Sequence, residues 1–293
     1  MNDGGDDAVE ERYADRYLTV CDGLKIHYRD YPGDPGKPPL LCLPGLTRNS
    51  RDFAELAKRY SPRFRVLTMD FRGRGLSDFD PQPMRYNPLT YARDVIELLD
   101  QLTIPQAIFV GTSLGGLVTM TIGAMAPHRI AASILNDIGP ELAQAGLDRI
   151  RGYVGNDLRF GSWDDAAETI AKNVGRIPAR YSHEDWVRMA RRVCREDNGK
   201  IRFDYDMSIV VPFEAAPTPT VDMWPLFAAL AQKPLLILRG EISDLLSGEA
   251  AAKMQTAAPH ARFAVVKGVG HAPELDEPEA VAAIDALLGS FDA

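Results

Sequence analysis

A serine in a glycine-rich turn is the first residue of this sequence whose surroundings suggest chemistry. Ser113 lies in Gly111-Thr112-Ser113-Leu114-Gly115, which matches the pattern G-x-S-x-G between a buried apolar run and a helical pattern. At a sharp turn from strand to helix the hydroxyl is exposed at the end of the sheet, and glycines avoid clashes with neighbouring backbone. The pattern therefore predicts that Ser113 is a nucleophile.

A serine nucleophile needs a base, and the sequence contains five histidines. A serine hydroxyl attacks a carbonyl group only when a base takes its proton. His271 directly follows the last predicted strand, and catalytic groups gather in loops at the carboxyl end of a parallel sheet. We therefore expect His271 to be the base. The remaining histidines are interpreted as surface or structural residues: His27, His128, His183 and His260.

The histidine in turn needs a carboxylate that fixes its tautomer and stabilises its protonated form. Asp244 follows the apolar run 234–241, and Asp137 follows the apolar run 131–136, so that each lies after a predicted strand. We expect Asp244 to be the acid. Asp137 is the alternative, and its other interpretation is a hydrogen bond in a loop or hinge.

Acyl transfer also needs two donors for the oxyanion. One is expected from the residue after the nucleophile and one from the loop after the third strand. Those are the backbone amides of Leu114 and, in Leu43-Pro44-Gly45-Leu46, of Leu46. The other interpretation of the second segment is a Pro-Gly turn without a catalytic role.

These groups must be positioned by an α/β fold. Short aliphatic runs alternate with amphipathic stretches, which is typical of parallel strands joined by helices. Asp22-Gly23 separates two runs that predict an N-terminal hairpin. Buried strands are predicted over 38–45, 65–71, 107–111, 131–137, 234–241 and 261–268, and helices over 51–60, 91–102, 114–127, 248–258 and 278–291.

The alternation breaks between residues 139 and 225, where we find only helical or irregular patterns. The sequence therefore predicts a core in two parts, 1–138 and 226–293, with a helical lid over 139–225 between them. Residues 1–12 are acidic and polar, and we interpret them as a frayed tail.

Five motifs together resemble the α/β-hydrolase fold superfamily, over nearly all of the chain outside the predicted lid and tail. They are Leu43-Pro44-Gly45-Leu46, Asp70-Phe71-Arg72-Gly73-Arg74-Gly75-Leu76-Ser77, Gly111-Thr112-Ser113-Leu114-Gly115-Gly116, Gly240-Glu241-Ile242-Ser243-Asp244 and Gly270-His271-Ala272-Pro273. The resemblance implies a mostly parallel sheet flanked by helices, and the order serine, aspartate, histidine along the chain. Pro44 is a departure, because many relatives carry histidine at that position.

The resemblance narrows the reaction. Haloalkane dehalogenases and epoxide hydrolases of this superfamily place aspartate where this chain has Ser113. Carbon-carbon hydrolases often have methionine after the serine and tryptophan after the histidine, where this chain has Leu114 and Ala272. We therefore expect a serine hydrolase that cleaves a carboxylic ester or lactone through an acyl-enzyme. A carbon-carbon hydrolase of a diketone, or a catalytically weak small-molecule binding protein of the same fold, remains an alternative.

Composition limits the partners. The 293 residues carry a formal charge of -8, which disfavours nucleic acid. The N-terminal residues do not resemble a secretory signal and no apolar run is long enough to cross a bilayer, so we expect a cytoplasmic protein without membrane contact. Three dispersed cysteines indicate neither a disulfide framework nor a zinc site. We expect a small-molecule substrate, no cofactor and no metal; the oligomeric state is left open.

Two further sets of residues within the predicted lid have alternative roles. Four arginines recur at helical spacing and could bind a carboxylate, although a solvated helix face explains them more simply: Arg188, Arg191, Arg192 and Arg195. The three tryptophans could line a pocket or pack the lid: Trp163, Trp186 and Trp224.

Overall fold

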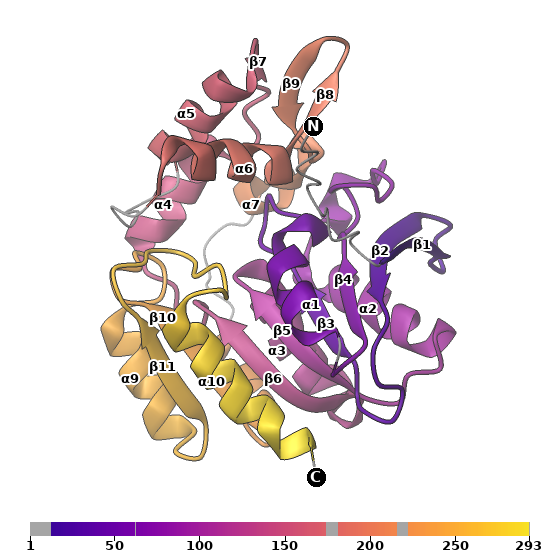
Figure 1. The fold of residues 1–293 in the computed structure, drawn as a ribbon, viewed down its shortest axis with the longest axis vertical. Helices are drawn as coiled ribbons and strands as arrows, with labels where there is room; N and C mark the ends of the chain where they lie inside the picture. The colour runs from indigo at the N-terminus through magenta and orange to yellow at the C-terminus, as the bar shows by residue number, and fades with distance from the viewer. Residues whose placement is uncertain (1–12, 62, 174–180, 216–221, 293) are drawn as a thin grey trace, which may run out of the picture.

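A single mixed sheet of eight strands forms the centre of the molecule (Figure 1). The computed structural model describes residues 13–61, 63–173, 181–215 and 222–292. The strand order is β1-β2-β4-β3-β5-β6-β10-β11. The predicted tail, 1–12, lies outside the described residues.

The N-terminal edge of the sheet is antiparallel. Strands β1 (Ala14–Thr19) and β2 (Lys25–Tyr31) form the predicted hairpin. Gly23 in its turn has φ +90°, a conformation that glycine adopts without steric cost. Strand β2 also pairs antiparallel with β4, which joins the hairpin to the rest of the sheet.

The other strands are parallel and mostly buried on both faces, as their continuous apolar runs predict. They are β3 (Leu40–Leu43), β4 (Val66–Met69), β5 (Ala107–Thr112), β6 (Ile130–Asn136), β10 (Leu235–Gly240) and β11 (Arg262–Val266). The predicted class, a mostly parallel α/β sheet flanked by helices, is confirmed.

Helices cover both faces of this sheet (Figure 1). One face packs against α1 (Ala54–Tyr60) and α10 (Pro278–Leu288). The opposite face packs against α2 (Pro88–Gln101), α3 (Leu114–Met125), α8 (Trp224–Leu230) and α9 (Gly248–Ala257). Short 3-10 turns are η1 (Ser50–Phe53), η2 (Pro83–Arg85), η3 (Pro127–Arg129), η4 (Met207–Val210) and η5 (Gly289–Phe291).

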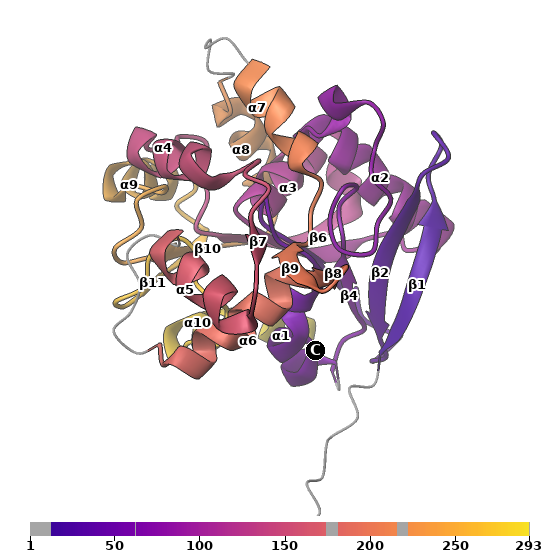
Figure 2. The ribbon, with the colours of Figure 1, turned by 90° about the horizontal axis from the view of Figure 1, so that it is seen from above.

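The segment between β6 and α8, called the insertion below, lies over one end of the sheet (Figures 1 and 2). Its elements are α4 (Gln144–Tyr153), β7 (Arg159–Phe160), α5 (Trp163–Asn173), α6 (His183–Val193), β8 (Cys194–Asp197), β9 (Lys200–Phe203) and α7 (Val211–Ala215).

The insertion is not purely helical, which differs from the prediction. Strands β7, β9 and β8 form a small antiparallel sheet. Strands β8 and β9 are joined through Asn198 and Gly199, with φ values of 51° and 75°. Asn-Gly is a strong signal for a hairpin turn, but the flanking strands are short and charged, so that no apolar alternation marked them.

Candidate active site

Ser113 occupies the turn between β5 and α3, in a backbone conformation that residues other than glycine rarely adopt. Its φ is 51° and its ψ is -115°. A Cβ on Gly111 would lie 2.6 Å from the carbonyl oxygen of Gly115, and a Cβ on Gly115 would lie 2.0 Å from that of Leu43. Both glycines are therefore required for the close approach of strand and helix that presents Ser113.

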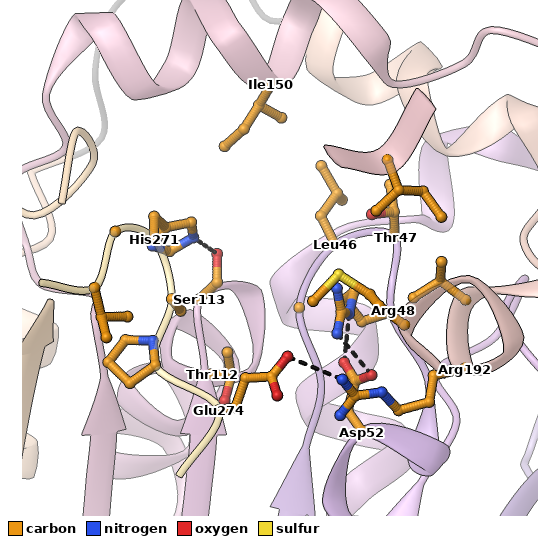
Figure 3. A pocket seen from close by; sticks show the side chains of 18 of the residues that line it. Leu46, Thr47, Arg48, Asp52, Thr112, Ser113, Ile150, Arg192, His271 and Glu274 are labelled. Carbon is orange, nitrogen blue, oxygen red and sulfur yellow. Dashed lines mark hydrogen bonds and ion pairs between the residues drawn. The ribbon is translucent and has the colours of Figure 1, made fainter. Parts of the chain in front are cut away.

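His271 lies in the loop after β11 and faces Ser113, as Figure 3 shows. Its Nε2 is 2.9 Å from Ser113 Oγ. Its Nδ1 is 2.7 Å from Oδ2 of Asp137, a carboxylate that is completely buried. Serine, histidine and aspartate thus form a continuous chain of hydrogen bonds, in which the histidine can take the serine proton while the aspartate stabilises the resulting imidazolium.

Asp137, and not Asp244, is therefore the carboxylate hydrogen-bonded to His271, and the prediction of Asp244 as the acid is wrong. Asp137 directly follows β6, with φ 55°. Its carboxylate also accepts hydrogen bonds from the Gly240 amide at 2.8 Å and from Ser243 Oγ at 2.5 Å. The sequence motifs do not predict Ser243 as a member of this site.

Asp244 instead forms a bidentate ion pair across to the insertion. Arg149 of α4 donates to it from Nε at 2.6 Å and from Nη2 at 2.8 Å. These hydrogen bonds hold the pKa of Asp244 below its ordinary value. The carboxylate is thus saturated by a cation on the side of the insertion and does not orient the histidine.

Neighbouring strands fix the spacing of Ser113 and Asp137. Thr112 and Asn136, the residues that precede them, face each other in the parallel pairing of β5 and β6. The Ser113 amide also donates to the Asn136 carbonyl at 3.1 Å. The distance between the two functional groups therefore follows from sheet hydrogen bonding.

The predicted oxyanion segment lies beside Ser113. An ideal Cβ on Gly45 would lie 3.8 Å from Ser113 Cβ. Leu46 lines the cavity in front of the serine, and Leu114 begins α3. Arg74, which is completely buried, donates from Nε to the Leu46 carbonyl at 2.8 Å. This bond fixes the peptide that follows Leu46, a positioning role that the sequence analysis did not assign to Arg74.

A cavity with a volume of about 160 Å³ adjoins Ser113 and His271. The insertion supplies much of its apolar wall through Ile150, Met189 and Phe203. In Figure 3, Ile150 lies across the cavity from His271 and Ser113. Small apolar groups can therefore be bound directly in front of the serine.

The arginines of the insertion do not share one role. Arg192 lines the cavity and donates to Glu274 at 2.9 Å (Figure 3), so the interpretation as a solvated face fails for this residue. Arg188 is largely exposed, and Arg191 lies over the ring of Trp163. The cavity lining includes none of the tryptophans among the described residues.

His27 is a second histidine that contacts carboxylates. It is buried between two of them. Nδ1 lies 2.7 Å from Asp70 and Nε2 lies 2.8 Å from Asp15. Because these contacts join β1, β2 and the end of β4, His27 has the structural role expected from the sequence.

Residues 13–61, 63–173, 181–215 and 222–292 contain neither a cluster of metal-ligating side chains nor a membrane-spanning helix. No group of three or more histidine, cysteine, aspartate or glutamate side chains there could hold a metal ion. No helix in the same ranges is long and apolar enough to cross a membrane.

The chain is similar to known protein families and solved structures. The family model described as "Alpha/beta hydrolase family" matches residues 40–284. The chain belongs to the α/β hydrolase family. Among solved structures, this α/β hydrolase is similar to one from Novosphingobium aromaticivorans, with 50% identity and a TM-score of 0.90 over 94% of this chain and 98% of the other.

Two curated relatives of this α/β hydrolase are named as hydrolases. A 3-hydroxybutyrate-oligomer hydrolase of Cupriavidus necator is 32% identical over 88% of this chain and 90% of its own. A 2-(acetamidomethylene)succinate hydrolase of Mesorhizobium japonicum is 30% identical over 83% of this chain and 84% of its own. The resemblance drawn from the sequence is thus confirmed at the level of the family.

Proposed function

We propose that this α/β hydrolase is a serine hydrolase that cleaves a short carboxylic ester or lactone through an acyl-enzyme. The observation that carries the proposal is the hydrogen-bonded chain Ser113–His271–Asp137 at the wall of a partly enclosed, largely apolar cavity. The cavity volume of about 160 Å³ resembles the roughly 150 Å³ of an engineered cavity that binds benzene, which favours a small acyl or alcohol group.

The first half-reaction transfers the acyl group to the enzyme. Ser113 Oγ attacks the ester carbonyl carbon while His271 Nε2 takes the hydroxyl proton, and Asp137 stabilises the imidazolium. The amides of Leu46 and Leu114 bind the oxyanion, and each such donor is worth roughly 100- to 1,000-fold in kcat. Collapse of the tetrahedral intermediate breaks the bond to the alcohol, which leaves with the proton from His271.

The second half-reaction releases the acid. Water attacks the acyl-enzyme carbonyl and gives its proton to His271, and the intermediate then expels Ser113 as the leaving group, which regains that proton. Apolar side chains of the insertion limit access of bulk water to this reaction, so we assign the insertion the role of a lid.

The relatives support an ester as the substrate class. The Cupriavidus necator enzyme is named for oligomers of 3-hydroxybutyrate, and the units of such oligomers are joined by ester bonds. The second relative is named for a substituted succinate and not for an ester. The competing function is therefore hydrolysis of a bond other than an ester bond.

The test is hydrolysis of p-nitrophenyl acetate, butyrate and hexanoate by wild type, Ser113→Ala and Ser290→Ala. Ser290 is a matched control, because it does not line the cavity and its hydroxyl donates to the Leu287 carbonyl. We expect Ser113→Ala to lower kcat about 10⁴-fold or more and Ser290→Ala to leave it unchanged. Equal activity in wild type and Ser113→Ala would refute the mechanism, and inactivity of wild type on all three esters would favour the competing function.

A further inference from the structure

Three arginines line the cavity in front of Ser113, although a neutral ester requires no cation there. They are Arg48, Arg149 and Arg192, and the carboxylates in the same lining are Asp52 and Glu274. Removing a guanidinium group from water costs free energy that must be offset by partners. Each arginine therefore needs a structural or a functional explanation.

Two of the three arginines connect the insertion to the core. Arg149 of α4 binds Asp244 in the loop after β10. Arg192 of α6 binds Glu274, three residues after His271. These ion pairs hold parts of the chain together that are distant in sequence, which explains both arginines without a ligand.

Arg48 has no such connecting role. It donates from Nε and Nη2 to Asp52, only four residues away in the same core segment, at 2.5 and 2.9 Å. This bidentate pair fixes the plane of the guanidinium group but uses only one of its edges. Within the described ranges Nη1 has no hydrogen-bond acceptor, so an edge of the cation is available to a ligand in the cavity.

The Arg48 side chain also lies close to the nucleophile. The point where a Cβ on Gly45 would lie is 3.3 Å from Arg48 Cγ and 3.8 Å from Ser113 Cβ. In Figure 3, Ser113 lies between His271 and Arg48. An alcohol that takes its proton from His271 leaves on the histidine side, which would place the acyl group of a bound ester toward Arg48.

We propose that the substrate carries a free carboxylate on its acyl group and that Arg48 binds this carboxylate. Arg48 is then the residue that determines specificity, and Asp52 is the residue that positions it. The inference rests on the proposed ester hydrolysis and adds the chemical class of the acyl group.

The test compares esters whose acyl groups end in a carboxylate or in its neutral methyl ester. The anionic substrates are p-nitrophenyl hydrogen glutarate and p-nitrophenyl hydrogen adipate, and the neutral counterparts are their methyl esters. Uncatalysed hydrolysis is subtracted, because a terminal carboxylate can attack its own ester. Charge-assisted hydrogen bonds of this kind predict a wild-type preference in kcat/KM of about 10- to 100-fold for the anionic member of at least one pair.

Variants separate binding from folding. We expect Arg48→Met to reduce the preference to about one and Arg48→Lys to retain part of it, because lysine keeps the charge but not the fork of donors. Arg151→Met is the control, since Arg151 forms a similar local pair with Asp148 on the exposed side of α4 and should leave the preference unchanged. In Arg48→Met the carboxylate of Asp52 loses its partner and could itself repel an anionic substrate. The double variant Arg48→Met/Asp52→Asn removes both charges and so controls for this repulsion.

The outcomes are distinct. A wild-type preference below about twofold for both pairs would overturn the carboxylate proposal while leaving ester hydrolysis intact. Equal loss of activity on anionic and neutral esters in the single and double variants would also overturn it, because Arg48 would then support only the fold of its loop. Inactivity of wild type on all four esters would instead count against the proposed function as well.

Discussion

At the scale of single residues, the position of the acid differs most from expectation. Ser113 and His271 could be predicted because each lies in a short motif after an apolar run. The acid could not be assigned, because β6 and β10 are adjacent and Asn136 faces Leu238 across them. Aspartates after either strand thus end near the histidine, and only the side-chain geometry distinguishes Asp137 from Asp244.

Exchange of each aspartate for asparagine tests this assignment. Asp137→Asn is expected to lower kcat about 10⁴-fold, because an amide cannot stabilise the imidazolium and favours the wrong tautomer of His271. Asp244→Asn should have a far smaller effect, since it removes a contact to Arg149 and not to the histidine. Steady-state kinetics on a p-nitrophenyl ester measure both; a larger loss in Asp244→Asn would restore the sequence-based assignment.

At the scale of elements, the close approach of α3 to β3 supports the serine turn. The strands and helices of the core follow the apolar patterns closely, because burial on both faces leaves a continuous signal in the sequence. The strands of the insertion leave no such signal. Strand β8 reads Cys-Arg-Glu-Asp, and its pairing depends on the Asn198-Gly199 turn and on packing against other parts of the insertion.

Substitution of two glycines by alanine tests how much the close packing of α3 on β3 contributes to the stability of the protein. Gly115→Ala should lower the free energy of unfolding by about 1–3 kcal/mol, because its Cβ would overlap the Leu43 carbonyl and force strand and helix apart. Gly152→Ala in α4 is the control: its Cβ meets nothing within 4 Å, so a gain of up to about 1 kcal/mol is expected. Urea denaturation compares the two, and equal effects would contradict the close-packing explanation.

At the scale of the whole molecule, a few polar contacts hold the insertion on the core. Asn49 and Arg51 both donate to the carbonyl of Arg192, at 2.8 and 2.7 Å. Arg51 also binds the buried carboxylate of Asp204 at 2.6 Å. The existence of the insertion could be predicted from the interrupted alternation, but these contacts could not, because they join residues that are far apart in sequence.

Loss of Arg51 should therefore loosen the insertion without unfolding the sheet. In Arg51→Met, amide hydrogens of α6 and β9 should exchange about 10- to 100-fold faster, as expected when hydrogen bonds to charged groups are lost. Strand β5 should exchange at the wild-type rate. Arg188→Met, an exposed arginine of α6, is the control, and uniform acceleration across the sheet would argue that the insertion and the core open as one unit.

The facing pair Thr112 and Asn136 has a consequence for the diversification of such enzymes. Ser113 and Asp137, which follow this pair, take their spacing from the pairing of β5 with β6, whereas much of the apolar cavity wall belongs to the insertion. The reactive groups and much of the apolar cavity wall therefore belong to separable parts of the chain. Replacing the segment between Ile138 and Met223, in evolution or by design, can therefore change which apolar groups fit the cavity while the positions of Ser113 and Asp137 stay the same.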